Sequence, residues 1–331
     1  MKKMLLFCGS LLVVATLLFV SCQKDDEVNP TINKFFSVED ATLIKKNMPE
    51  PTVNDQIDVS MNASAIPGGT SIVRVFAEKV AKKILVGMKD QAGYYELVPS
   101  TRGEYSFLMQ VNQDITLEDE TKGFTVQVAI EDEDGGITQI WETTVKLIAV
   151  GTGDLQVSLS FDNAKDVDLH LIEPEYTNAD GEPVSFYSRH IYYGNNVAYY
   201  SGGILDLDSN AGCDIDNVNN ENITYSEESG FVPAGTYKVY VDLFENCDPN
   251  IPTNYVVTVF YGGVRIANKA GVFDAGAPST SNPIDEEYVA ANDPFLTFTI
   301  AGNGQKCTKV GEGHAVLSEK AQEKEAIAVH K

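Results

Sequence analysis

Residues 155–161 read Leu-Gln-Val-Ser-Leu-Ser-Phe, with a large apolar side chain at every second position. Successive side chains of a β-strand point to opposite faces, so this period places one face of the segment in a core. Residues 124–130, Phe-Thr-Val-Gln-Val-Ala-Ile, repeat the pattern, and we expect their other face to meet water. The sequence therefore predicts an all-β protein made of antiparallel β-sandwiches.

Two β-rich bodies extend from these stretches, over residues 52–150 and 151–300, and Gly151-Thr-Gly153 marks their junction. The first resembles a bacterial immunoglobulin-like domain. A hairpin is expected where glycines end the turn at residues 131–136. Strands are predicted at residues 56–62, 83–88, 94–98, 105–111, 124–130, 137–148, 155–161, 167–172, 190–193, 235–243, 255–261 and 295–300. Residues 301–331 are expected to be a flexible tail.

The N-terminus carries an export signal. Lys2 and Lys3 precede an apolar run that ends at residue 20, and Ser21-Cys22 follows. A small residue before Cys resembles the lipobox of bacterial lipoproteins, which implies that residues 1–21 are removed and that Cys22 is acylated. The alternative is an uncleaved anchor, because about 17 apolar residues can just span a bilayer. We expect a lipid anchor, followed by a flexible linker over residues 22–51.

Residues 23–27, Gln-Lys-Asp-Asp-Glu, resemble the surface-export signal of Bacteroidetes lipoproteins. The resemblance implies display on the outer face of the outer membrane. A solvated acidic linker is the alternative interpretation. The membrane partner is then the lipid bilayer, which the protein contacts through Cys22.

The charge of the chain excludes one class of partner. The formal net charge is -24, from 48 acidic and 24 basic residues, and residues 151–300 contribute 18 of the surplus negative charges. Phosphate backbones are bound through Lys and Arg, so we expect no nucleic-acid partner.

An ordered set of short motifs runs through the second body. The motifs are residues 155–161, Asp166-Val-Asp168-Leu-His170-Leu, Ile191-Tyr-Tyr193-Gly194, Ser201-Gly-Gly-Ile-Leu-Asp206-Leu-Asp208, Glu221-Asn-Ile223 and Pro233-Ala-Gly235-Thr-Tyr237-Lys-Val-Tyr-Val241. Together they resemble the YfaP-like family, which has no established reaction. The resemblance covers residues 153–262 and implies a β-sandwich of exported proteins. This chain departs from simpler members by an insertion at residues 175–188 and by a pair of cysteines.

Alternating carboxylates in two segments predict a calcium site. Calcium takes six to eight oxygen ligands at about 2.3–2.6 Å, and Asp-x-Asp-x-Asn spacing lets one loop wrap a cation. The match to an EF-hand is incomplete, and a thrombospondin type 3 loop is closer. We expect Asp166 and Asp168 of one segment to meet Asp206 and Asp208 of the other. A solvated acidic surface is the alternative. The candidate ligands are Asp166, Asp168, Asp206, Asp208, Asn210, Asp214 and Asp216.

Three cysteines remain after Cys8 and Cys22 are assigned to the signal and the anchor. We call residues 206–216 the acidic loop. Cys213 closes this loop and Cys247 follows a predicted strand, so we expect a disulfide between them in an oxidising compartment. Free thiols are the alternative. Cys307 is then the odd cysteine.

Tyrosines concentrate in the second body, where Tyr192, Tyr193, Tyr199 and Tyr200 are candidates for stacking on sugars or anchoring an envelope or host protein. Core packing is the alternative. Motifs for zinc proteases, serine hydrolases and phosphate-binding loops are missing from the sequence. We therefore expect a binding or adhesion protein without enzymatic activity. The alternative is an accessory or catalytic hydrolase of extracellular polysaccharide or protein breakdown.

Overall fold

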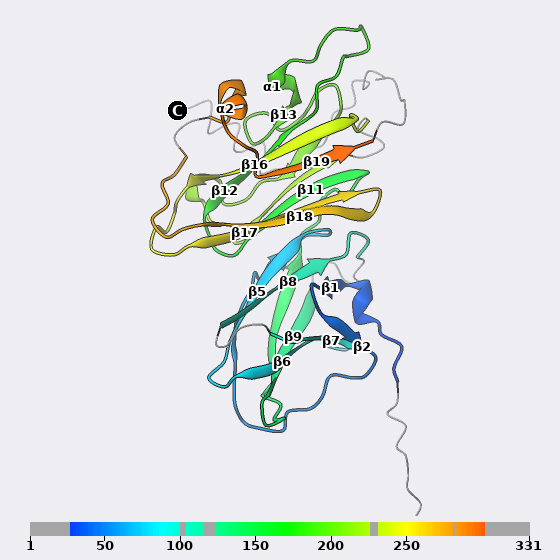
Figure 1. Cartoon of the computed structure of the whole chain (residues 1–331), viewed down its shortest axis with the longest axis vertical. Helices are drawn as coiled ribbons and strands as arrows, with labels where there is room; N and C mark the ends of the chain where they lie inside the picture. Colours follow the sequence, from blue (N-terminus) through cyan, green and yellow to red (C-terminus); the bar gives the residue numbers. More distant parts are fainter. Residues whose placement is uncertain (1–26, 100–103, 116–122, 226–230, 281–282, 302–331) are drawn as a thin grey trace, which may run out of the picture.

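The computed structural model describes residues 27–99, 104–115, 123–225, 231–280 and 283–301. These residues form largely antiparallel sheets arranged as two stacked bodies (Figure 1), which agrees with the all-β prediction. The predicted signal peptide, Cys22 and the tail after residue 301 lie outside the described residues. Among the described helices, none combines the length and the apolar character needed to cross a membrane.

The first body has a four-stranded and a six-stranded sheet around one apolar core. Among the described strands of this body, only β10 and β4 pair in parallel. In hydrogen-bonded order the sheets are β1 (Phe36–Val38), β8 (Glu104–Val111), β5 (Thr70–Phe76) and β3 (Asp58–Ser60), and β2 (Thr42–Ile44), β7 (Tyr94–Leu97), β6 (Ala81–Met88), β9 (Phe124–Asp132), β10 (Trp141–Leu147) and β4 (Ser64–Ala65). The predicted hairpin joins β9 to β10, and Gly135 at its turn has a φ of 84°.

One expectation was wrong: residues 22–51 do not form a flexible linker throughout. A short 3-10 helix, η1 (Ile32–Lys34), is followed by β1 and β2, which add one strand to each sheet of the first body. Phe36 and Ile32 are fully buried in its core. The short strands escaped prediction because three residues are too few to show an alternating pattern.

The second body has a five-stranded sheet packed against a four-stranded sheet. The core lies between them and includes the apolar side chains of β11 and β12. In hydrogen-bonded order the sheets are β14 (Ile204–Leu207), β15 (Asn220–Tyr225), β11 (Leu155–Phe161), β17 (Thr253–Tyr261) and β18 (Val264–Phe273), and β13 (His190–Ile191), β12 (Asp166–Ile172), β16 (Gly235–Glu245) and β19 (Leu296–Ile300). Short helices α1 (Phe186–Arg189), α2 (Glu286–Ala291) and η2 (Ala211–Cys213) lie in the connections.

The polar face of β11 packs against the first body. Every residue of this strand is buried, including Gln156, Ser158 and Ser160. The Gln156 amide donates to the carbonyl of Pro67 at 2.7 Å, and the Ser158 hydroxyl donates to that of Gly68 at 3.3 Å. The two bodies therefore meet through a hydrogen-bonded polar interface.

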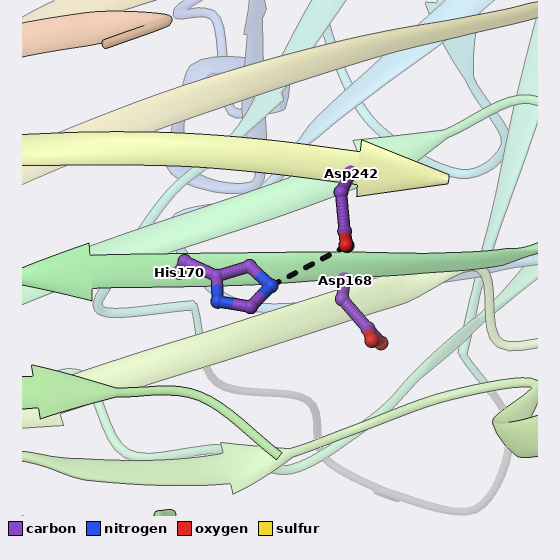
Figure 2. A group of neighbouring side chains, drawn as sticks. All are labelled: Asp168, His170 and Asp242. Atoms are coloured by element: carbon purple, nitrogen blue, oxygen red, sulfur yellow. Dashed lines mark hydrogen bonds and ion pairs between the residues drawn. The ribbon is translucent and has the colours of Figure 1, made fainter. Parts of the chain in front are cut away.

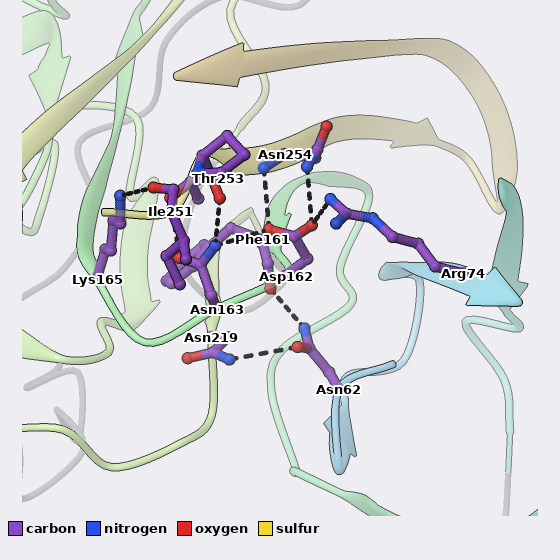
Figure 3. Close-up of polar contacts among 11 residues, drawn as sticks. Asn62, Arg74, Phe161, Asp162, Asn163, Lys165, Asn219, Ile251, Thr253 and Asn254 are labelled. Carbon is purple, nitrogen blue, oxygen red and sulfur yellow. Dashed lines mark hydrogen bonds and ion pairs between the residues drawn. The ribbon is translucent and has the colours of Figure 1, made fainter. Parts of the chain in front are cut away.

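An ion pair completes this interface (Figure 3). Arg74 of β5 pairs with Asp162, which follows β11, and Asp162 also accepts from the backbone and side-chain nitrogens of Asn254 at 2.9 Å. Asn62 of the first body donates to the carbonyl of Phe161 at 2.6 Å. The Asp162 side chain is only 9% exposed, so little solvent screens its charge.

We expect Arg74→Ala to destabilise the protein by about 2 kcal/mol, because it removes a charge-assisted hydrogen bond from a largely buried carboxylate. Arg265→Ala is the matched control, since Arg265 reaches Glu39 across the same interface but both side chains are about one third exposed. That loss should stay below about 1 kcal/mol. Urea unfolding of both variants measures the difference, and equal losses would contradict the account.

Candidate functional site

The open edge of β12 defines the candidate site. Its neighbour β13 pairs only with Leu171 and Ile172, so among the described strands none pairs with the earlier residues of β12 on that side. The Glu221 carboxylate of β15 covers this edge by accepting from the Leu169 backbone N–H at 2.7 Å. A carboxylate is therefore buried beside the alternating acidic residues of β12.

Three carboxylates meet at this edge. Asp168, Asp208 and Glu221 can place one oxygen each within 4.8 Å of the others, and all three are buried. Asp208 directly follows β14, where the pairing with β15 shifts register between Leu205 and Leu207. Such an irregularity redirects the side chains that follow it. The group can hold a metal ion, since buried carboxylates this close repel one another and favour a cation.

The structure brings together only part of the predicted ligand set. Asp168 and Asp208 meet, whereas Asp206 lies at the junction of the two bodies. There Asp206 accepts from the Gly151 backbone N–H at 2.5 Å and from the Asn222 amide at 2.7 Å. Burial raises the pKa of Asp206 to about 6, although both hydrogen bonds oppose that shift.

The remaining predicted ligands shape the acidic loop. Asp166 accepts from the Gly212 backbone N–H at 2.5 Å. Asn210 donates to the Lys165 carbonyl at 3.0 Å and accepts from the backbone N–H of Asp216 at 3.1 Å. Asp216 in turn accepts from the Val218 backbone N–H, and Asp214 is exposed. These contacts fix the loop that carries Asp208.

Glu221 is the residue that sequence reasoning missed as a ligand candidate. It shares the inward face of β15 with Ile223 and Tyr225, both of which are buried in the core. A carboxylate at an inward position of a strand is costly unless it is paired or hydrogen-bonded. An acidic residue at an inward position of a strand could therefore have identified Glu221 as a ligand candidate. β15 itself was not predicted, however, because its first three residues are polar.

The predicted disulfide is confirmed: Cys213 in η2 is bonded to Cys247, two residues after β16. The loop backbone has positive φ at Asn210, Gly212, Cys213, Asn217 and Asn219, a conformation that Asn and Gly tolerate better than other residues. The bridge therefore ties a loop with several left-handed residues to the end of β16, in the four-stranded sheet of the second body.

The predicted tyrosines occupy different environments. Tyr192 is half-buried and stacks on the rings of His190 and His170, with centroid distances of 4.2 and 5.2 Å. Tyr193 packs edge-on against Phe244, and Tyr199 packs edge-on against Tyr200. Tyr199 is 61% exposed, and Tyr187, which was not among the candidates, is 66% exposed.

A buried glutamate anchors the segment that bears these tyrosines. Glu173 follows β12 and accepts from the hydroxyls of Ser201, Tyr225 and Tyr176 at 2.5, 2.7 and 2.8 Å. Its backbone carbonyl accepts from Arg189 at 2.7 Å. Burial raises the pKa of Glu173 to about 7, although the hydroxyl donors and Arg189 act in the opposite direction.

The chain matches no protein-family model, and no curated protein matches it.

Proposed function

We propose that this chain is a lipid-anchored protein of the outer-membrane surface whose second body is a non-enzymatic binding module stabilised by calcium. The observation that carries the proposal is the group of three buried carboxylates, Asp168, Asp208 and Glu221. A folded protein that buries several acids together needs a compensating positive charge. The proposal is supported by the export signals expected within residues 1–27, because an exported protein meets more calcium than a cytoplasmic one.

Calcium fits the chemistry of this group better than magnesium does. All three ligands are carboxylates, and a separation of at most 4.8 Å suits oxygens that each lie about 2.3–2.6 Å from one ion. Magnesium dehydrates reluctantly and prefers sites that retain several waters, whereas these carboxylates are buried. Calcium bound here would tie β12, β15 and the acidic loop together.

The proposed binding surface is the tyrosine-bearing segment, residues 187–200. Tyr187 lies in α1, at the end of the second body that points away from the first body (Figure 1). Its ring and that of Tyr199 are mostly exposed. Exposed tyrosines combine an apolar face with a hydroxyl, which suits stacking on a sugar ring. We therefore favour a glycan as the ligand.

A binding role also agrees with the environment of Glu173. Its pKa of about 7 suits a general acid. Glu173 is 1% exposed, however, and both of its carboxylate oxygens already accept from hydroxyl groups. A substrate in solvent does not reach this carboxyl, so its altered pKa is better explained by a structural role.

The proposal is tested by screening the purified protein against a glycan array in millimolar calcium and in EGTA. We expect glycan binding in calcium, at least a tenfold loss for Tyr187→Ala with Tyr199→Ala, and no change for Phe76→Ala, an exposed ring on the first body. Binding by an envelope protein alone would redirect the proposal to a protein partner. Turnover of a polysaccharide by the wild type would overturn it.

A further inference from the structure

A second group of side chains that could hold a metal ion also includes Asp168. Asp168 of β12 and Asp242 of β16 are direct cross-strand partners. Like charges placed directly opposite each other destabilise a sheet. His170, two residues along the same face of β12, directs its Nε2 atom toward Asp242 Oδ1 at 3.3 Å (Figure 2).

These three residues form a mixed nitrogen and oxygen donor set. Asp168, His170 and Asp242 can each place one donor atom within 4.8 Å of the others. The side chain of His170 is 3% exposed and that of Asp242 is 11% exposed, so an ion can enter from the Asp242 side. Imidazole together with carboxylate suits zinc and other first-row transition metals, whereas calcium prefers oxygen ligands alone.

The surroundings of His170 provide an independent observation. Its Nδ1 atom lies 2.9 Å from Nε2 of His190, and the Tyr192 ring stacks on both imidazoles. Histidines that bind metals commonly hydrogen-bond through their other ring nitrogen, which fixes the tautomer and the orientation of the ring. When Nδ1–H of His170 donates to His190, the Nε2 lone pair faces the two aspartates.

We propose that His170, Asp168 and Asp242 bind a divalent transition metal ion, with Asp168 shared between this ion and the proposed calcium. His190 is the outer partner that orients His170. Because His190 begins β13 directly after α1, the ion connects the β12–β16 sheet to the segment that carries Tyr187 and Tyr192. This inference goes beyond the proposed function, since two of the three ligands belong to this group alone.

Zinc titration by calorimetry, in the presence of saturating calcium, tests the proposal. We expect one zinc ion per protein, and a loss of affinity of more than about 100-fold for His170→Asn and for Asp242→Asn. His190→Gln should weaken binding by about 10- to 100-fold, because it removes only the outer partner. Cobalt provides a second measurement, since its visible absorption bands should appear in the wild type and disappear in Asp242→Asn.

Two controls separate this site from others. His314→Asn with His330→Asn should leave zinc binding unchanged, and a loss there would assign the zinc to the tail. Asp208→Asn should keep zinc binding while it abolishes the calcium response, so the two proposals can fail separately. The proposal is overturned if the wild type binds no zinc in calcium, or if His170→Asn and Asp242→Asn bind zinc as the wild type does.

Discussion

Replacing Cys213 and Cys247 together by serine will lower the free energy of unfolding by about 4 kcal/mol. The bridge joins residues separated by 34 positions, and closing a loop of this length restricts the unfolded chain by about that amount. The native loop should also loosen, because Asn210, Cys213 and Asn217 hold left-handed backbone conformations that the bridge helps to maintain.

Guanidinium unfolding of the double variant measures this loss, and Cys307→Ser, which leaves the bridge intact, is the matched control. The stabilisation by calcium should fall as well, because Asp208 precedes the stapled loop and its position depends on it. A loss of less than about 1 kcal/mol would mean that the bridge constrains neither the unfolded chain nor the acidic loop.

The ionisation of Glu173 will lower the free energy of unfolding by about 3 kcal/mol as the pH rises from about 4.5 to just above 7. Burial raises its folded-state pKa to about 7, from an ordinary value of 4.5. Between these values the folded chain binds a proton that the unfolded chain has lost, so the contribution present at low pH disappears as the pH rises. Each tenfold change in an acid constant corresponds to about 1.4 kcal/mol.

The measurement compares urea unfolding of the wild type and Glu173→Gln at about pH 5 and pH 8. The amide cannot ionise, so the variant should gain about 2.5 kcal/mol relative to the wild type over this interval. Glu175→Gln is the matched control, since Glu175 is exposed two residues away. Asp206 titrates in the same direction, with a pKa of about 6, but contributes equally to both proteins. Parallel pH dependences for the wild type and Glu173→Gln would contradict the account.

Alternation predicted the strands that have one apolar face. The segment 155–161 was predicted with the bounds that β11 has, because its inward residues are all large and apolar. Strands without that contrast were missed. β15 begins with Asn-Glu-Asn, and β18 has no residue that is fully buried, so neither shows an apolar period. The polar face of β11 also gave no sign that it meets another body.

The candidate site was predicted in part, because sequence spacing shows which residues share a strand but not which strands meet. Asp168 and Asp208 meet as expected, whereas Asp166 and Asp206 form other hydrogen bonds, and the third carboxylate, Glu221, was not predicted. Asp206 and Asp208 are two residues apart, so an unbroken strand would place both side chains on one face. The register shift between Leu205 and Leu207 interrupts this alternation. Asp206 therefore hydrogen-bonds to Gly151, whereas Asp208 lies near Asp168. The disulfide was predictable because the expected export signal and lipid anchor account for Cys8 and Cys22, which leaves only three cysteines to pair.

The most direct test of the account is the thermal unfolding of the purified protein in EGTA and in calcium at about 100 times its dissociation constant. A site filled to this degree adds about 2.7 kcal/mol, which corresponds to a rise in Tm of about 5–10 °C. The account predicts this rise for the wild type and for Asp214→Asn, whose side chain is exposed in the same loop, and its loss in Asp208→Asn. A wild-type Tm that is the same in calcium and in EGTA would contradict the account.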